Sequence, residues 1–310
     1  MPAAAGASLA RLKARSWQTL RGLLGLVPGF NALSRWRILH KYKQAELDYC
    51  AGRLRPSTDH PTVLYFGTSR SGAKPAAKVF LPQLLAPAGL RALDLEGLRF
   101  NGGAMNLEQR EAEGRLGEVF QPRGFFFGPL RRLYRGIPEL ERYRVILQLR
   151  DPRDVLVSSY FSLVYSHTIP FQNPPAARSY EAYRLYMRSM SIDRSVLERA
   201  PAFRRIYADY LDQLLGRPNV LLLRYEQMVT DFPSWLEKVE GFLELDLPAA
   251  ERAAFVRSSQ AYLRVDGVDP YRDRRQMTPG DHRRQLQPET VARLNELLGD
   301  VLGGLGYLRG

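Results

Sequence analysis

An apolar stretch that ends abruptly at an arginine constrains the fold of this chain more than any other feature. Residues 145–149 have the apolar pattern of a buried strand, and Arg150 follows them directly. Asp151-Pro152 ends the strand, and an amphipathic helix pattern begins after it. Ser158 lies eight residues after Arg150. A strand end, turn and helix start of this kind can present a guanidinium, a hydroxyl and backbone N–H groups to one anion.

A second strand, turn and helix unit lies upstream. Residues 62–66 form a strand pattern that leads into Gly67-Thr-Ser-Arg-Ser-Gly72 and then a helix. The two glycines have the spacing of a P-loop, but Ala73 occupies the lysine position and Pro75 the metal-binding hydroxyl position. A magnesium-dependent NTPase is therefore poorly supported. Two anion-binding turns in one chain instead suggest a nucleotide with phosphates at both ends.

Strand and helix patterns alternate along most of the chain. The predicted strands are residues 62–66, 90–95, 117–121, 144–149 and 219–223, and the predicted helices are 33–47, 76–85, 153–166, 180–188, 195–215, 235–243, 249–258 and 288–302. This alternation predicts an α/β, three-layer fold with a central, mostly parallel sheet flanked by helices, like that of P-loop NTPases. Ligands on such sheets bind beyond the carboxyl ends of the strands, where both anion turns are expected.

The positive charge is concentrated near the N-terminus. The net charge is +13, and residues 1–55 hold ten Lys and Arg against two Asp and Glu, a net +8. We therefore divide the chain into a basic, partly helical appendage, residues 1–55, and a main domain, residues 56–310. One interpretation of the appendage is peripheral contact with anionic lipid or an acidic assembly, and the other is a solvated arm. Nucleic-acid binding is not expected, because no module of that class is present.

Cysteine content and hydropathy bear on the compartment. Cys50 is the single cysteine, so the chain can form neither an intrachain disulfide nor a thiol-based zinc site. No apolar run approaches the roughly 18–20 residues that span a bilayer. These features predict a cytoplasmic protein, membrane-peripheral if the appendage binds lipid.

Four segments, in order, resemble the motifs of sulfotransferases that use 3′-phosphoadenosine 5′-phosphosulfate (PAPS). The Thr68–Gly72 turn resembles the family's Pro-Arg/Lys-Ser-Gly-Thr loop, which holds the 5′-phosphosulfate. The Arg150–Ser158 segment is similar to the Arg-x-Pro-x-Asp-x-x-x-Ser segment, which holds the 3′-phosphate. Tyr225-Glu-Gln-Met228 resembles a Tyr-Glu-Asp-Met element near the adenosine, and residues 275–281 resemble a late Arg-Lys-Gly-x-x-Gly-Asp loop that closes over the nucleotide.

The resemblance implies a set of nucleotide-binding residues: Arg70, Ser71, Gly72, Ala73, Lys74, Arg150, Ser158, Tyr225, Arg274, Arg275 and Gly280. The chain departs from the family's nucleotide motifs in three places, the first of which is Ser69 in place of the loop proline. Ala73-Lys74 replaces two hydroxyl residues, and Gln276-Met277 replaces Lys-Gly, which leaves Arg274 or Arg275 to supply the late positive charge. Alone, Arg150 is also typical of a strand-end salt bridge, Ser158 of a helix serine bonded to its own turn and Tyr225 of a core tyrosine. Their joint placement favours the nucleotide site.

The resemblance also implies catalytic roles. Arg70 stands where the family has Lys or Arg, so we expect it to stabilise charge on the leaving nucleotide. An acceptor hydroxyl needs a general base, and the family's Lys-Thr-His is absent from its expected place at residues 121–124. Glu96 is the first candidate, by loose similarity to carbohydrate-modifying members. Asp94 and His167 are the second and third, and each of the three is also typical of a solvated side chain.

The implied function is transfer of a sulfuryl group from PAPS, without a metal, to an acceptor hydroxyl. The acceptor is expected to be a glycan, a lipid-linked sugar or another small metabolite. One alternative is a nucleotide-dependent phosphotransferase, which predicts ATP binding and magnesium dependence. Another is a non-catalytic module that binds nucleotides or polyanions, which the missing histidine favours. The sequence leaves acceptor identity and oligomeric state undefined.

Overall fold

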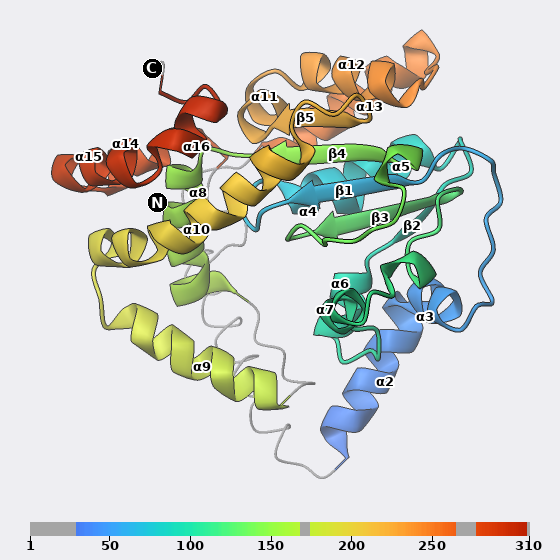
Figure 1. Ribbon diagram of the computed structural model, residues 1–310, viewed down its shortest axis with the longest axis horizontal. Helices are drawn as coiled ribbons and strands as arrows, with labels where there is room; N and C mark the ends of the chain where they lie inside the picture. Colours follow the sequence, from blue (N-terminus) through green and yellow to red (C-terminus); the bar gives the residue numbers. More distant parts are fainter. Residues whose placement is uncertain (1–28, 168–173, 265–276, 309–310) are drawn as a thin grey trace, which may run out of the picture.

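The computed structural model describes residues 29–167, 174–264 and 277–308. Its centre is a five-stranded sheet in the order β2-β3-β1-β4-β5, and every neighbouring pair of strands is parallel. The strands are β1 (Val63–Gly67), β2 (Arg91–Leu93), β3 (Phe125–Leu130), β4 (Arg144–Leu149) and β5 (Val220–Arg224). The predicted parallel sheet with helices around it is confirmed (Figure 1).

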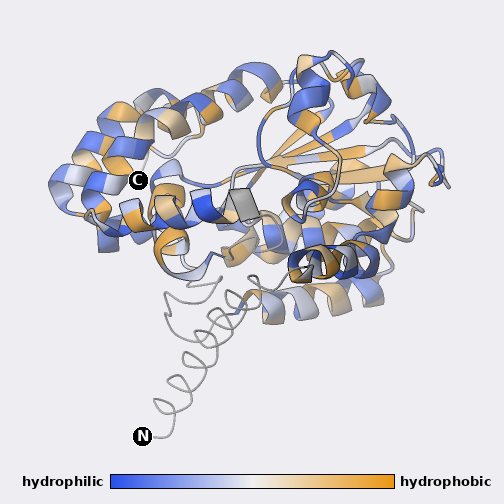
Figure 2. Cartoon of the chain, turned by 90° about the horizontal axis from the view of Figure 1, so that it is seen from below, coloured by the Kyte–Doolittle hydropathy of each residue, from blue (hydrophilic) through white to orange (hydrophobic). Residues whose placement is uncertain are grey.

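The three inner strands are apolar along their length because the sheet is covered on both faces. All residues of β1 and β3 are buried, and β4 is buried from Val145 onward. Such continuous burial, without a polar alternation, is typical of parallel strands between helical layers. Figure 2 shows these strands in hydrophobic colours between helices of mixed colour.

One face of the sheet packs against the segment after β1 and two helices after β5. This layer contains α4 (Ala73–Pro75), a π-helical turn (Ala76–Phe80), α5 (Leu81–Leu85), α12 (Phe232–Leu243) and α13 (Ala249–Leu263). The Phe80 ring lies at the centre of the layer, 5.2 Å from the Phe232 ring centroid and 6.3 Å from that of Trp235. These aromatic contacts fix the helix that starts at the first anion turn.

The opposite face packs against helices from several parts of the chain. They are α3 (Gln44–Cys50), α6 (Leu95–Phe100), α7 (Leu107–Ala112), α8 (Pro152–Phe161), α10 (Ile192–Leu214), α15 (Pro288–Leu297) and α16 (Gly299–Gly304). Figure 1 shows α10 crossing this face. Further helices are α2 (Phe30–Tyr42), α9 (Pro174–Arg188), α11 (Tyr225–Thr230) and α14 (Asp281–Gln285).

Three predictions of secondary structure are wrong. The helix predicted at residues 288–302 is two helices, α15 and α16, which meet at Leu298. The strand predicted at residues 117–121 is absent, since Leu116–Glu118 is a 3₁₀ turn and the strand is β3, Phe125–Leu130. Gly128-Pro129 within β3 is a turn signal, and it masks the strand in the sequence. The helix predicted at residues 33–47 is two helices, α2 and α3, which meet at Lys43.

The boundary at residue 55 stays a prediction. Helix α3, which lies before it, packs on the sheet through Tyr49, whose ring centroid lies 4.9 Å from that of Phe125. The Tyr49 hydroxyl donates to the Val119 carbonyl oxygen. Helix α3 is therefore packed on the sheet, and a segment that projects from the main domain would have to end before α3.

Candidate active site

The turns that follow β1 and β4 meet at the carboxyl edge of the sheet. The two strands are neighbours, with Gly67 opposite Gln148, so both turns leave the sheet side by side. Arg70 Nε donates to Ser158 Oγ at 3.1 Å, and Arg150 Nη1 donates to the Arg70 carbonyl oxygen at 3.3 Å. The structure thus brings together the three residues expected to hold the two ends of a nucleotide.

The first turn has a backbone shape that few residues adopt. Arg70 has a φ of +70° and Gly72 a φ of +78°. A Cβ at Gly72 would lie 2.7 Å from side-chain atoms of both Tyr225 and Met228, so only glycine fits there. A non-glycine residue in the left-handed region costs about 1–3 kcal/mol, and such residues concentrate at ligand sites. The strained conformation of Arg70 therefore fits a binding role for this turn.

The other residues of this turn differ in exposure. Ser71 is buried, its Oγ donates to the Thr68 carbonyl oxygen at 2.7 Å, and its own carbonyl accepts from Gln148 Nε2 at 2.9 Å. Ala73 is buried, whereas Lys74 is exposed in the first helical turn. The Ser71 side chain therefore holds the turn in shape, and Lys74 is placed to meet a ligand from solvent.

Arg150 is buried against the ring of Tyr225. Its guanidinium carbon lies 4.3 Å from the ring centroid, and the Tyr225 hydroxyl donates to the Met277 carbonyl oxygen at 3.3 Å. Arg150 Nε is buried and has no hydrogen-bond partner among the described residues. A buried N–H without an acceptor costs about 1–3 kcal/mol, so this donor is suited to an anionic ligand.

Asp154, which the sequence motifs did not single out as a site residue, joins α8 to the late loop. Its fully buried carboxylate accepts from the backbone N–H groups of Gly280 and His282, at 2.8 and 2.9 Å, and from His282 Nδ1 at 2.7 Å. Arg150 Nη2 lies 3.4 Å from the same carboxylate. Burial alone would raise the pKa of Asp154, but the hydrogen bonds from His282 and the charge of Arg150 hold it well below its usual range.

Two predicted contacts in the late loop lie outside the described residues. These are Arg274 and Arg275, and the described chain resumes at Met277. Gly280 is placed, with a φ of +78° at the start of α14. Its N–H points at Asp154, so this part of the loop is attached to the helix that carries Ser158.

Glu96, the first candidate for the base, lies at the carboxyl end of β3. Its Oε1 accepts from the backbone N–H of Arg131 and from the Tyr134 hydroxyl, each at 2.9 Å. Leu130 in β3 lies opposite Phe66 in β1, so this carboxylate is next to the first anion turn. Burial raises the pKa of Glu96 against the lowering effect of these two hydrogen bonds. A raised pKa suits a carboxylate that accepts a proton near neutral pH.

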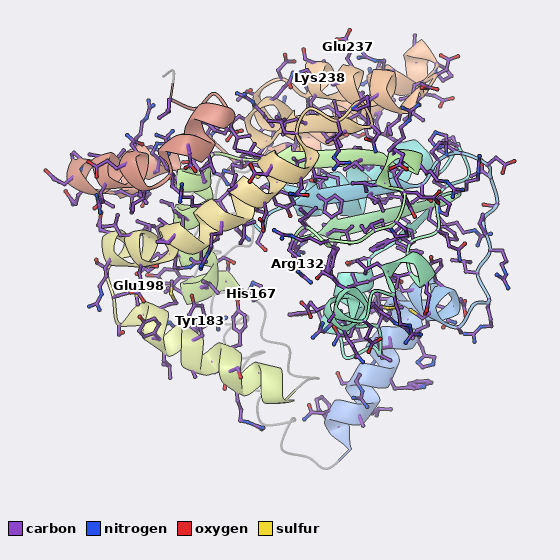
Figure 3. All side chains as sticks on the ribbon, in the orientation of Figure 1. Arg132, His167, Tyr183, Glu198, Glu237 and Lys238 are labelled. Carbon is purple, nitrogen blue, oxygen red and sulfur yellow. The ribbon has the colours of Figure 1, made fainter. Side chains whose placement is uncertain are left out.

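The two rival bases have other contacts. Asp94 forms ion pairs with Lys43 and Lys78, at 3.2 and 2.6 Å, and caps α6. The His167 ring stacks on Tyr180, with centroids 4.7 Å apart, and Figure 3 shows it near α9. Asp94 is thus held by two lysines, whereas Glu96 has one longer ion pair, with Arg131 Nε at 3.6 Å, which favours Glu96 as the proton acceptor.

Comparison with known proteins agrees with this geometry. The model of the Sulfotransferase domain family matches residues 136–306, more than half of the chain. The chain belongs to this family. No curated protein matches the chain. The sulfotransferase match begins after β3, so the first anion turn and Glu96 lie outside the matched residues.

Solved structures share the sulfotransferase fold at low sequence identity. A mouse sulfotransferase complexed with PAP has a TM-score of 0.54 and 16% identity, and the alignment covers 80% of this chain and 86% of that one. A retinol dehydratase in complex with androsterone and the inactive cofactor PAP has a TM-score of 0.52 and 16% identity, with 84% and 86% covered. The expected family and the three-layer fold are confirmed, and with the family the enzyme class, a sulfotransferase.

The sequence motifs placed the anion turns of this sulfotransferase but missed other residues. The expected place of the family's Lys-Thr-His, residues 121–124, precedes β3 and therefore lies at the wrong edge of the sheet. The segment that follows the carboxyl end of β3 contains Arg131, Arg132 and Tyr134 and no histidine. Glu96 accepts hydrogen bonds from the backbone of Arg131 and from the Tyr134 hydroxyl. If the end of β3 had been predicted correctly, Arg131, Arg132 and Tyr134 would have been recognised as site residues, because ligands bind beyond the carboxyl ends of the strands.

Two further searches covered the described residues. No group of three or more His, Cys, Asp or Glu side chains in residues 29–167, 174–264 and 277–308 is arranged to hold a metal ion. Within the same part of the chain, every helix is too short or too polar to cross a membrane.

Proposed function

We propose that this sulfotransferase transfers the sulfuryl group of PAPS to an acceptor hydroxyl on a glycan, a lipid-linked sugar or another small metabolite. The contact that supports this proposal best is the meeting of Arg70, Arg150 and Ser158 at one place. A cation at each of two adjacent turns suits a ligand with a charged group at each end. We refer to these three residues with Asp154 and Gly280 as the donor end.

In this proposal the donor end holds PAPS. Arg70, Ser71, Gly72, Ala73 and Lys74 bind the 5′-phosphosulfate. Arg150 and Ser158 bind the 3′-phosphate, and Tyr225 lies near the adenosine. Arg274, Arg275 and Gly280 close the late loop over the nucleotide. The buried Arg150 Nε, which has no hydrogen-bond partner among the described residues, supports the fit. Gly72 lets the first turn pack closely against Tyr225 and Met228, which keeps the turn in its shape.

The acceptor is activated beside the donor end. PAPS, when bound, supplies the sulfuryl group and a phosphate leaving group. Glu96 accepts the proton of the acceptor hydroxyl as the new oxygen–sulfur bond forms. The Arg70 guanidinium stabilises the negative charge that develops on the leaving phosphate oxygen, an effect worth roughly 3 kcal/mol for one well-placed donor. His167 is the alternative base.

The protein is proposed to be cytoplasmic, and the part of the basic N-terminal segment that precedes α3 is proposed to contact an anionic membrane surface. Exposed Leu33 and Trp36 on α2, next to Arg35 and Arg37, support this contact. A basic helix with exposed apolar side chains binds anionic lipid through both properties.

Calorimetric titration tests the proposal. We expect tight binding of PAP, adenosine 3′,5′-bisphosphate, without magnesium, and weak binding of ATP. We also expect release of PAP from PAPS to depend on an added acceptor. A preference for ATP with magnesium would instead indicate a phosphotransferase. PAP binding with no transfer to any acceptor would indicate the non-catalytic module.

A further inference from the structure

Three arginines near α9 lack a carboxylate partner. Many arginines elsewhere pair with a carboxylate, for example Arg110 with Glu118, Arg132 with Glu111, Arg135 with Asp209, Arg144 with Glu244, Arg204 with Asp300 and Arg252 with Glu240. Arg184, Arg188 and Arg199 form no such ion pair with any residue of the described chain. Their positive charge is therefore not neutralised by protein carboxylates.

Two of these three arginines have a structural explanation. Arg184 Nε donates to the Leu163 carbonyl oxygen at 3.0 Å, and Arg188 Nη2 donates to the Val164 carbonyl oxygen at 2.9 Å. These carbonyls belong to the π-helical turn Ser162–Ser166 that extends α8. Cations at the C-terminal end of a helix stabilise its unpaired carbonyl groups.

Arg199 has no comparable explanation. It lies in the first turns of α10, with its guanidinium carbon 5.2 Å from the centroid of the Phe203 ring. Its Nη1 is buried and has no hydrogen-bond partner among the described residues. Burial lowers the pKa of Arg199, as expected for a cation removed from water without an acid beside it.

Arg199 shares its surroundings with an aromatic stack. The rings of Tyr180 and His167 lie nearly parallel, 4.7 Å apart, and the Arg184 guanidinium carbon lies 5.9 Å from the Tyr180 ring centroid. Burial raises the pKa of Tyr180 to about 12, and the charges of Arg184, Arg199 and Arg70 act to lower it. We call Tyr180, His167, Arg184 and Arg199 the acceptor corner.

The acceptor corner has a link to the donor end and another to the helix of the proposed base. The charge of Arg70 of the donor end acts on the Tyr180 hydroxyl. The Phe100 ring, at the end of the helix that carries Glu96, meets the His167 ring edge-on at 6.4 Å. Figure 3 shows His167 with Tyr183 of α9 nearby and Arg132 at the end of β3. An acceptor whose hydroxyl meets Glu96 and Arg70 therefore extends toward Tyr180 and Arg199.

We propose that the acceptor is anionic, a molecule with a sugar or aromatic ring whose carboxylate, phosphate or sulfate binds Arg199 while the ring packs on Tyr180. This inference deepens the proposed function and rests on it. A guanidinium with an unused buried donor is suited to oxyanions, which accept from it in a fixed geometry. An aromatic face is suited to a ring, because both are flat and apolar.

Binding to the enzyme–PAP complex tests the inference without a known acceptor. Calorimetry would compare p-nitrophenyl β-D-glucuronide with p-nitrophenyl β-D-glucoside, which have the same rings but differ in the carboxylate. A second pair, 2-naphthyl phosphate and 2-naphthol, tests a phosphate. We expect at least one anionic member to bind about ten- to a hundredfold more tightly than its neutral partner. The stronger of the two pairs identifies the type of anion.

Variants of Arg199 show whether this residue causes the preference for anionic ligands. Arg199→Gln should remove the preference for the anion and leave PAP affinity unchanged, and Arg199→Lys should retain part of the preference. Arg204→Gln, which removes an exposed arginine from the same helix, is the matched control and should change neither. If Arg199→Gln does not fold, the Arg199→Lys variant and the wild-type ligand pairs decide.

The outcomes separate this inference from the proposed function. Failure to bind PAP would overturn both. Normal PAP binding with equal affinity within each ligand pair, or with no binding of any of the four ligands, would overturn only the anionic acceptor. A preference for the anion that survives in Arg199→Gln would also overturn it.

Discussion

The donor end and the acceptor corner differ in how their buried arginines are neutralised. At the donor end, Arg150 lies beside Asp154, and the same carboxylate accepts hydrogen bonds from the late loop. At the acceptor corner, Arg199 has an aromatic neighbour and no carboxylate partner in the described chain. The comparison suggests that the nucleotide site is fixed before the ligand arrives, whereas the acceptor site obtains its counter-charge from the ligand.

Electrostatics gives the physical reason for this difference. A buried ion pair holds its members in one geometry, and removal of one member leaves the other without compensation. Arg150 must be aligned with Ser158 across a narrow turn, so its orientation matters. An unpaired arginine such as Arg199 keeps its full attraction for an anion, at the expense of some stability in the empty protein.

The largest expected effect is at the donor end. Asp154→Ala would leave Arg150 and two backbone N–H groups of the late loop without their acceptor. We expect the free energy of unfolding to fall by about 3–5 kcal/mol, as for other broken buried pairs. Urea unfolding measures this change, and calorimetry should show weaker PAP binding. Asp209→Ala, which breaks the exposed pair with Arg135, is the control and should cost about 1 kcal/mol or less.

The next effect lies on the acceptor side and should change turnover without changing stability. Glu96→Gln keeps the size of the side chain and its acceptor oxygen but cannot accept the proton. We expect turnover of PAPS to fall about a hundredfold or more, with PAP affinity nearly unchanged. Initial rates and calorimetry measure the two separately. Turnover close to that of the wild type would exclude Glu96 as the base and turn attention to His167.

A smaller effect should appear in the pH dependence. Glu96 must be ionised to act, and its pKa is raised by burial, so turnover should fall on acidification at a higher pH than for an ordinary carboxylate. Tyr134→Phe removes a hydrogen bond that favours the ionised form, so the acidic limb should move further upward. A shift of about half to one pH unit corresponds to one hydrogen bond. If the acidic limb of the pH profile is unchanged in Tyr134→Phe, the group that titrates in this limb is not Glu96.

Local sequence patterns predicted the donor end well because its motifs are short. The turn at Arg70 and the segment from Arg150 to Ser158 each fold from neighbouring residues, and the register of β1 with β4 brings them together. Asp151 is the N-cap of α8. The pairing of Asp154 with His282 was beyond reach, because it joins residues 128 positions apart.

The acceptor side was harder to predict for two physical reasons. The strand β3 is hidden by Gly128-Pro129, and this error moved the end of the middle strand to the wrong edge of the sheet. Arg199 lies on a helix rich in charged side chains, where periodicity alone does not separate a half-buried arginine from a solvated one. Its significance comes from its Nη1, which has no hydrogen-bond partner among the described residues.

The most direct test compares the affinities for PAP and adenosine 5′-monophosphate, which lacks the 3′-phosphate, in the wild type and in Ser158→Ala. If Arg150 and Ser158 hold the 3′-phosphate, the wild type should bind PAP about a hundredfold more tightly, and Ser158→Ala should reduce this ratio about tenfold. Equal affinity for the two nucleotides in the wild type would contradict a site that binds the donor at both of its charged ends.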